Sequence, residues 1–171
     1  MFKLPVAFIF TGPPGAGKST IYNTYHPHLP LIDIDKYAGS YQAKRRQRQH
    51  ALTRALHQHK NFVFTTAAPT RAQKEWWYAL AHQHKFHPIV VALTPPKLLA
   101  YARHKARGHH DRLSKGIDKW YSTYTAHSRE YRIKHSDVLT AYHNALHGHG
   151  TFAPYRQWED YQSPQESQLH P

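Results

Sequence analysis

Residues 12–19, Gly-Pro-Pro-Gly-Ala-Gly-Lys-Ser, fit the spacing G-x-x-x-x-G-K-[ST] and directly follow an apolar run at 6–10. A buried strand, a glycine-rich turn and a helix start form the setting in which this spacing holds phosphate groups. The glycines let backbone N–H groups close around an anion, while the lysine reaches the outer phosphates and the serine can hold Mg²⁺. The segment therefore predicts a site for ATP and Mg²⁺, with contacts from Gly12, Gly15, Ala16, Gly17, Lys18, Ser19 and Thr20.

Two carboxylates follow the next apolar run, at Asp33 and Asp35. If both end a strand, their side chains project on one face of it, because side chains alternate along a strand. Ligands of open parallel sheets bind beyond the carboxyl ends of the strands, where the lysine of the loop also lies. We expect Asp35 to accept the proton of an attacking hydroxyl, and Asp33 to hold magnesium or its water. The alternative is that one aspartate caps the next helix or that both balance the positive loop.

A basic cluster follows the last of the apolar runs. Arg103 and Arg107 are four residues apart, and so share one face of a helix. Positive side chains on a segment of this kind can close over a triphosphate and stabilise charge during phosphoryl transfer. We expect Arg103 and Arg107 to act in catalysis and Arg112 to contact the nucleotide; the competing interpretation is a solvated basic helix end. The cluster consists of Arg103, Lys105, Arg107, Arg112 and Lys115.

Apolar runs at 6–10, 31–34, 62–64 and 89–93 alternate with segments of helical length. This alternation predicts an α/β fold, with a parallel sheet flanked by helices and a basic lid segment. Helices are expected from Gly17, over 39–60 and 70–85, from Pro95-Pro96, and over 117–147 with a break near Ser136-Asp137. The sequence offers no clear fifth strand after the fourth helix.

The chain has 171 residues, which is enough for one domain with a proper core. We expect that domain over residues 1–150. Residues 151–171 are rich in Gln, Ser and Pro and are expected to form a partly disordered tail. The absence of cysteine excludes disulfides and thiolate metal sites, and the paired histidines are not spaced to share a helical face, so we expect no zinc site.

No apolar stretch is long enough to cross a membrane. Met1–Pro5 runs straight into the first expected strand and leaves no room for a signal peptide. These features predict a cytoplasmic protein, in the host cytoplasm if the protein is viral.

The charge is strongly positive: 23 Lys and Arg against 10 Asp and Glu give +13. A polyanionic partner, DNA or RNA, would explain this excess, and a generally basic surface is the alternative. We expect the strand-binding side chains on and before the second helix, at Lys36, Lys44, Arg45, Arg46 and Arg48. Aromatic side chains available to stack on bases are Tyr37, Tyr41, Trp76 and Trp77, although the tryptophan pair is better explained as core.

Three segments together resemble a known family: 11–20 (TGPPGAGKST), 32–37 (IDIDKY) and 101–108 (YARHKARG). They are similar to the P-loop kinases typified by the phage-type 5′-hydroxyl polynucleotide kinases, of which the zeta-toxin-type kinases are close relatives. The resemblance covers about residues 5–135. It implies a P-loop kinase fold that uses ATP and Mg²⁺, with Asp35 as general base and Lys18, Arg103 and Arg107 on the transferred phosphate.

The chain departs from that family on the acceptor side. Ala38 stands where the polynucleotide kinases carry an arginine that grips the acceptor phosphate, and residues 65–68 read Thr-Thr-Ala-Ala in place of an Asp-x-Thr-Asn-like stretch. Lys36 or the basic run of the second helix is available as a substitute. The acceptor pocket is therefore expected to be rebuilt, so that a hydroxymethylated base in DNA, as in phage DNA hypermodification, is as consistent as a 5′-hydroxyl end.

Three functions remain open from the sequence. The first is an ATP-dependent phosphotransferase acting on a hydroxyl of a nucleic acid. The second is a small-metabolite or nucleotide kinase of zeta-toxin-like type, and the third is a non-catalytic nucleic-acid-binding P-loop ATPase. A motor-type ATPase needs a carboxylate at the end of the third strand for its magnesium, and Thr65-Thr66 offers none. The oligomeric state is also left open.

Overall fold

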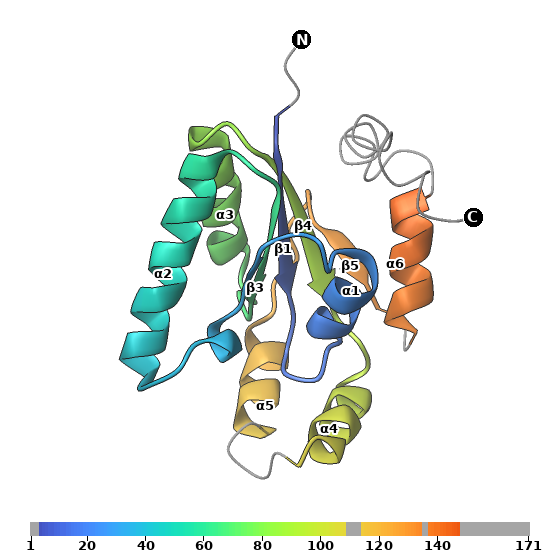
Figure 1. The fold of residues 1–171 in the computed structure, drawn as a ribbon. Helices are drawn as coiled ribbons and strands as arrows, with labels where there is room; N and C mark the ends of the chain where they lie inside the picture. The colour runs from blue at the N-terminus through green and yellow to red at the C-terminus, as the bar shows by residue number, and fades with distance from the viewer. Residues whose placement is uncertain (1–3, 109–113, 135–136, 148–171) are drawn as a thin grey trace, which may run out of the picture.

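The computed structural model describes residues 4–108, 114–134 and 137–147. Five parallel strands form one sheet in the order β2-β3-β1-β4-β5, with helices on both faces (Figure 1). This confirms the expected α/β architecture. The strands are β1 (Val6–Thr11), β2 (Leu31–Ile32), β3 (Phe62–Thr66), β4 (His87–Leu93) and β5 (Tyr131–Ile133).

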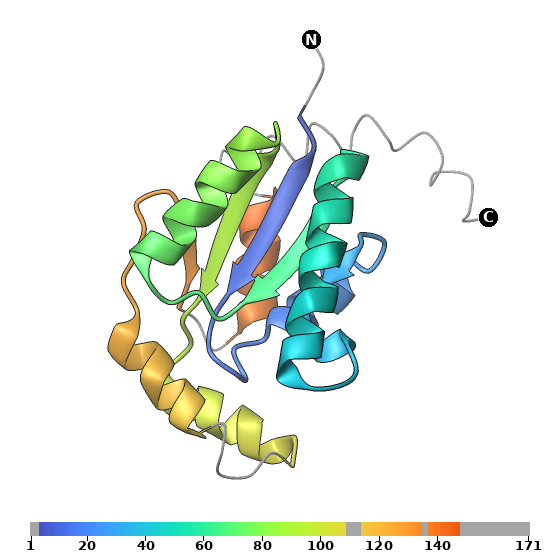
Figure 2. The same ribbon diagram turned by 90° about the vertical axis from the view of Figure 1, so that its left-hand side faces the viewer.

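Helices α1 and α6 cover one face of the sheet, and α2 and α3 cover the other (Figures 1 and 2). Helices α4 and α5 lie beyond the carboxyl ends of the strands, on the side of the loop that follows β1 (Figure 1). The bounds are α1 (Lys18–Tyr25), the 3-10 helix η1 (Ile34–Lys36), α2 (Tyr41–Gln58), α3 (Arg71–Gln83), α4 (Lys97–Ala106), α5 (Ser114–Thr123) and α6 (Val138–His147).

The central strand β1 explains why the sheet is covered on both sides. All six of its residues are buried, as expected for a parallel strand between two layers of helices. Phe8 and Phe10 pack toward α1 and α6, whereas Ile9 packs toward α2 and α3. On the first face His26 lies against the fully buried Tyr142, with 2.6 Å between its Nε2 and the tyrosine hydroxyl. Burial lowers the pKa of His26 to about 3.

The fifth strand corrects the sequence interpretation of residues 117–147. That stretch was expected to be helical, but α5 ends at Thr123, β5 pairs with β4 in the register Val91↔Tyr131, and only then does α6 begin. β5 has three residues with an exposed arginine in the middle, so it carries no apolar run. Pairing with β4, and not local propensity, makes this segment a strand.

The adjacent tryptophans of α3 have different surroundings. Trp77 is buried against Phe64, with 4.2 Å between the ring centroids, as the core interpretation expected. Trp76 is 52% exposed, so that interpretation is wrong for this residue. The expected tail at 151–171 lies outside the described residues.

Candidate active site

The loop after β1 is shaped by two glycines in left-handed conformations. Gly15 has a φ of 77° and Gly17 a φ of 99°, which side chains rarely adopt. A Cβ on Gly15 would also lie 2.6 Å from the carbonyl oxygen of Ala100, so the loop packs closely on α4. The amides of Gly15, Gly17 and Lys18 donate no hydrogen bond to another described residue. Such outward amides at a helix start form an anion-binding concavity, and they fit phosphate oxygens.

Lys18 is held at the mouth of this loop. Its Nζ donates to the carbonyl oxygens of Gly12, at 2.8 Å, and Pro13, at 3.0 Å. Burial lowers the pKa of Lys18 to about 8, the carboxylates of Asp33 and Asp35 oppose this shift, and Arg107 adds to it. Electrostatic effects of this kind act over short distances. Asp33, Asp35 and Arg107 are therefore close enough to Lys18 for their charges to act on it.

The two aspartates are not placed as the sequence predicted. β2 ends at Ile32, so Asp33 and Asp35 do not alternate along a strand. Asp33 is the N-cap of η1 and accepts a hydrogen bond of 2.9 Å from the amide of Asp35, which lies in the 3-10 helix. Asp33 therefore caps a helix, which was the alternative role expected for one of the two aspartates. Asp35 is exposed and carries no capping bond of this kind, which leaves its carboxylate open to a substrate.

The charges of the two lid arginines act on different groups. Arg107 is the C-cap of α4, and its charge acts on Lys18. Hydrogen bonds from Thr140 are the main cause that lowers the pKa of Asp137 at the start of α6, and the charge of Arg103 adds to it. Both arginines belong to the segment that packs on the loop, since Ala100 of α4 lies against Gly15. Arg112 lies outside the described residues.

A magnesium site at this position would be incomplete on protein ligands alone. Ser19 follows Lys18 in the first turn of α1, and Asp33 is half-buried nearby. Within residues 4–108, 114–134 and 137–147, no group of three or more His, Cys, Asp or Glu side chains could hold a metal ion. Mg²⁺ is commonly bound by one or two protein oxygens together with substrate phosphates and water. Ser19 and Asp33 fit that pattern and not a cage made only of protein.

Among the arginines of α2, Arg48 is the half-buried one. Its guanidinium lies 5.3 Å from the centroid of the Phe64 ring in the middle of β3. Burial raises the pKa of Tyr37, the charges of Arg54 and Arg48 of α2 oppose this shift, and Asp33 adds to it. Arg45 and Arg46 are exposed. Outside α2, Lys36 turns toward α1, with its ammonium 5.3 Å from the Tyr22 ring.

Sequence reasoning missed the contacts that fix the loop after β3. Trp120 of α5 donates from Nε1 to the carbonyl oxygen of Ala67 at 2.5 Å, and the hydroxyl of Thr11 donates to Ala68 at 2.9 Å. Thr125 adds a backbone bond of 2.9 Å to Pro69. These residues come from three distant parts of the chain, and no spacing in the sequence predicts their contacts.

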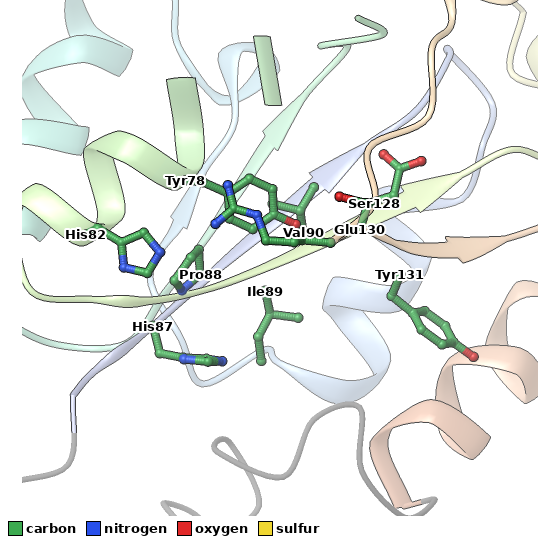
Figure 3. A pocket seen from close by; sticks show the side chains of 10 residues that line it. Tyr78, His82, His87, Pro88, Ile89, Val90, Ser128, Glu130 and Tyr131 are labelled. Carbon is green, nitrogen blue, oxygen red and sulfur yellow. The ribbon is translucent and has the colours of Figure 1, made fainter. Parts of the chain in front are cut away.

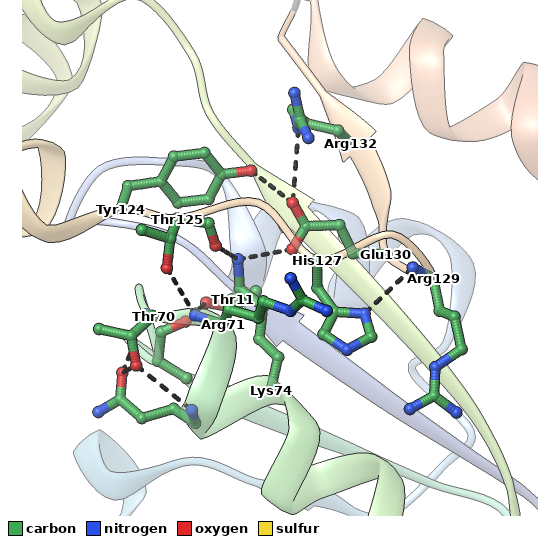
Figure 4. Close-up of polar contacts among 12 residues, drawn as sticks. Thr11, Thr70, Arg71, Lys74, Tyr124, Thr125, His127, Arg129, Glu130 and Arg132 are labelled. Atoms are coloured by element: carbon green, nitrogen blue, oxygen red, sulfur yellow. Dashed lines mark hydrogen bonds and ion pairs between the residues drawn. The ribbon is translucent and has the colours of Figure 1, made fainter.

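A buried ion pair lies behind that loop (Figure 4). Lys74 of α3 and Glu130 are 2.6 Å apart, with both side chains fully buried. The lysine also donates to the carbonyl of Thr125 at 2.9 Å, and the hydroxyl of Tyr124 donates to Glu130 at 2.5 Å. Burial lowers the pKa of Lys74 against the opposing effect of Glu130. The pair ties the connection between α5 and β5 to α3.

A protein-family model described as an AAA domain matches residues 8–126, which include the phosphate loop, η1 and α4. The chain belongs to this AAA domain family. No curated protein matches the sequence of this AAA domain. Among the described residues, no helix is both long and apolar enough to cross a membrane.

Solved structures with the same fold include several kinases. A gluconokinase from Sinorhizobium meliloti 1021 is 17% identical, with a TM-score of 0.62, 95% of the AAA domain chain covered and 99% of the other. The Pnkp1/Rnl/Hen1 RNA repair complex gives 14% identity and a TM-score of 0.59, over 72% and 45%. The APS kinase CysC of Mycobacterium tuberculosis, in complex with AMPPNP and APS, gives 16% and 0.53, over 80% and 91%. At these identities the likeness establishes the P-loop kinase fold.

Proposed function

We propose that this AAA domain is an ATP- and Mg²⁺-dependent phosphotransferase with an alcohol group as acceptor. The observation that carries the proposal is the glycine-shaped loop after β1, whose amides at Gly15, Gly17 and Lys18 donate no hydrogen bond to another described residue and whose lysine is held on the loop carbonyls. The charges of Asp33, Asp35 and Arg107 act on this lysine. Catalysis of phosphoryl transfer consists mainly of positioning and of stabilising charge, and these groups can supply both.

In the proposed reaction the acceptor oxygen attacks the γ-phosphorus in line, and the bond to the bridging oxygen of the β-phosphate breaks to release ADP. Asp35 accepts the proton of the acceptor hydroxyl, since its carboxylate is exposed beside Lys18. Lys18 and the loop amides hold the outer phosphates, and Arg107 stabilises the charge on the transferred group. Mg²⁺, held by Ser19 and Asp33, would supply further charge neutralisation.

We propose a nucleic acid as the source of the acceptor hydroxyl, either a 5′-hydroxyl end or a hydroxymethylated base in DNA. The formal charge of +13 and the basic stretch of α2 support this substrate, because phosphate contacts dominate affinity for nucleic acids. Arg48 is the half-buried arginine of that stretch, and its charge acts on Tyr37. It is therefore the best substitute for the acceptor arginine that Ala38 does not provide.

A small metabolite is the second candidate acceptor. It is supported by the gluconokinase structure, which matches over nearly the full length of both chains and so shows this fold at this size in a small-molecule kinase. The third candidate, a P-loop ATPase without transfer, predicts that Asp35→Asn leaves all activity unchanged. A kinase would lose transfer with that variant and still bind ATP.

Transfer of labelled γ-phosphate to a panel of acceptors tests these candidates together. The panel holds 5′-hydroxyl DNA and RNA, duplexes with hydroxymethylated bases, gluconate and free nucleosides. Label on a polymer, followed by digestion to locate it, supports the nucleic-acid kinase. Label only on a small molecule overturns that acceptor and supports the second candidate. Free phosphate alone, unaffected by Asp35→Asn, overturns the phosphotransferase.

A further inference from the structure

A cavity of about 400 Å³ lies beside residues 87–90 of β4 (Figure 3). β1 pairs with β4 on one edge from His87 onward, but on the other edge β5 pairs only with Val91–Leu93, so within the described residues no strand covers that edge of the first half of β4. Helix α3 and residues 128–131 form the walls of the gap that remains. β4 begins at His87 beside Val6, the first residue of β1, whereas the phosphate loop follows the last residue of β1. The cavity extends along β4 as far as Val90, which lies beside Ile9, so its near end is three residues of β1 from Gly12, roughly 10 Å at about 3.3 Å per residue.

The lining of this cavity joins an apolar wall to hydrogen-bond donors. Pro88, Ile89 and Val90 provide the wall. Arg129 lies over the Tyr78 ring, 4.0 Å from its centroid, and bonds Glu75 at 2.9 Å. A guanidinium has five N–H donors, so this pair leaves most of them available.

Two further features bear on the kind of ligand that the cavity could bind. The Tyr78 hydroxyl has no hydrogen-bond partner within the described part of the chain, although the residue is only 3% exposed. Buried polar groups are normally satisfied, and one that is not marks a place where a ligand group can bind. Glu130, the carboxylate in the lining, is already paired with Lys74. The negative charge of Glu130 is therefore compensated by Lys74.

We propose that this cavity is a second ligand site that binds a small organic anion, namely a phosphate or carboxylate carried on a compact apolar or aromatic body. The oxyanion accepts from Arg129 and, at the floor, from Tyr78, while the body packs on Ile89 and Val90. The volume suits a ligand of this size, since small-molecule sites begin at about 300 Å³. The site is separate from the proposed ATP site and does not depend on the reaction proposed above.

Backbone amide shifts in NMR spectra of the full chain test the proposal, with phenyl phosphate, benzoate and uncharged benzyl alcohol as probes. We expect saturable shifts at residues 89–90 and 128–131 with one or both charged probes, and much weaker shifts with benzyl alcohol. Saturating ATP and Mg²⁺ should leave these shifts unchanged, whereas it should abolish any at residues 15–19. The preferred oxyanion, phosphate or carboxylate, is read from the two affinities.

Two substitutions make the test specific. Arg129→Gln should weaken the charged probe about tenfold or more, because a hydrogen bond to a charged group is lost. Tyr78→Phe should weaken it several-fold without lowering the melting temperature, because the hydroxyl it removes has no partner. Tyr41→Phe, on the exposed start of α2, is the matched control. The proposal is overturned if neither charged probe saturates at these amides, if benzyl alcohol binds equally well, or if both substitutions leave binding unchanged.

Discussion

Lys18 is the residue at which the local charges of the site meet. Its ammonium donates to two loop carbonyls, and burial lowers its pKa to about 8 against the opposing charges of Asp33 and Asp35, with a smaller effect of Arg107 in the same direction as burial. A lysine with this pKa is partly neutral in mildly alkaline solution. The phosphates of a nucleotide favour the charged form, so binding should be coupled to protonation.

We therefore predict that Lys18 takes up a proton when Mg²⁺-saturated ATP binds at alkaline pH. With a pKa of about 8, roughly three quarters of Lys18 is neutral at pH 8.5 and roughly a tenth at pH 7. Uptake should accordingly be about 0.7 proton at pH 8.5 and close to zero at pH 7. Titration calorimetry in buffers of different ionisation enthalpy measures this difference. Equal uptake at the two pH values would contradict the assignment.

Arg48 differs from its neighbours in α2 by being half-buried over Phe64. We predict that Arg48→Gln raises the KM for the nucleic-acid acceptor about tenfold or more, because a charge-assisted bond to the acceptor is lost. The KM for ATP should stay unchanged. Arg45→Gln is the matched control, since its exposed charge should alter the KM only about two-fold and only at low salt. Steady-state kinetics decides between them, and equal effects of the two variants would count against a special role for Arg48.

At the scale of elements, helix α5 and its connection to β5 support the loop after β3. Helix α5 bonds the loop after β3 through Trp120, and the connection bonds the same loop through Thr125 and is fastened to α3 by the pair of Lys74 and Glu130. Removing one partner of this buried pair should lower the free energy of unfolding more than removing one partner of an exposed pair, because it leaves an uncompensated charge in the interior.

Lys74→Met should thus lower the free energy of unfolding by about 3–5 kcal/mol. The chain offers a matched control in Lys97→Met, because Lys97 and Asp118 form a pair of 2.5 Å whose side chains are 45% and 55% exposed. That substitution should cost at most about 1 kcal/mol. Urea unfolding of both variants gives the comparison. A cost for Lys74→Met no larger than for Lys97→Met would show that the pair does not anchor this connection.

The elements that the sequence predicted are those with strong local signals. Strand β1 and the phosphate loop combine a continuous apolar run with fixed glycines, so both appear where expected. Strand β5 could not be predicted, because three residues with a central Arg132 carry no pattern and acquire their structure from β4. The different surroundings of Trp76 and Trp77 depend on how α3 is rotated on the sheet. Asp33 turned out to be a helix cap because β2 is two residues shorter than its apolar run suggests.

At the scale of the whole molecule, two buried layers meet at the central strands, and one of them contains a histidine that must stay neutral. His26 links the end of α1 to Tyr142 of α6, and burial lowers its pKa to about 3. In the unfolded chain the pKa of histidine is about 6.5. Between these two values the unfolded state binds more protons than the folded state, so stability falls as the pH falls.

We predict that the free energy of unfolding drops by about 2–3 kcal/mol between pH 7 and pH 4.5 through His26 alone. Urea unfolding at several pH values measures the total slope, and His26→Gln isolates this contribution. The variant should be less stable at pH 7, yet should lose less stability on acidification than the unchanged protein. Parallel pH profiles for the two proteins would assign the acid sensitivity to other groups.

The three glycines of the phosphate loop have consequences for how the protein is made. A Cβ on Gly12 would meet the carbonyl of Leu93, one on Gly15 that of Ala100, and one on Gly17 the side chain of Val138. The loop is thus translated well before the residues that surround it. A nascent chain cannot complete the nucleotide site when the loop itself is made, because these contacts join parts of the chain that are far apart in the sequence. Ribosome-bound chains that stop before α6 should lack the contact over Gly17, so we expect the nucleotide to stabilise the fold only after α6 has been translated.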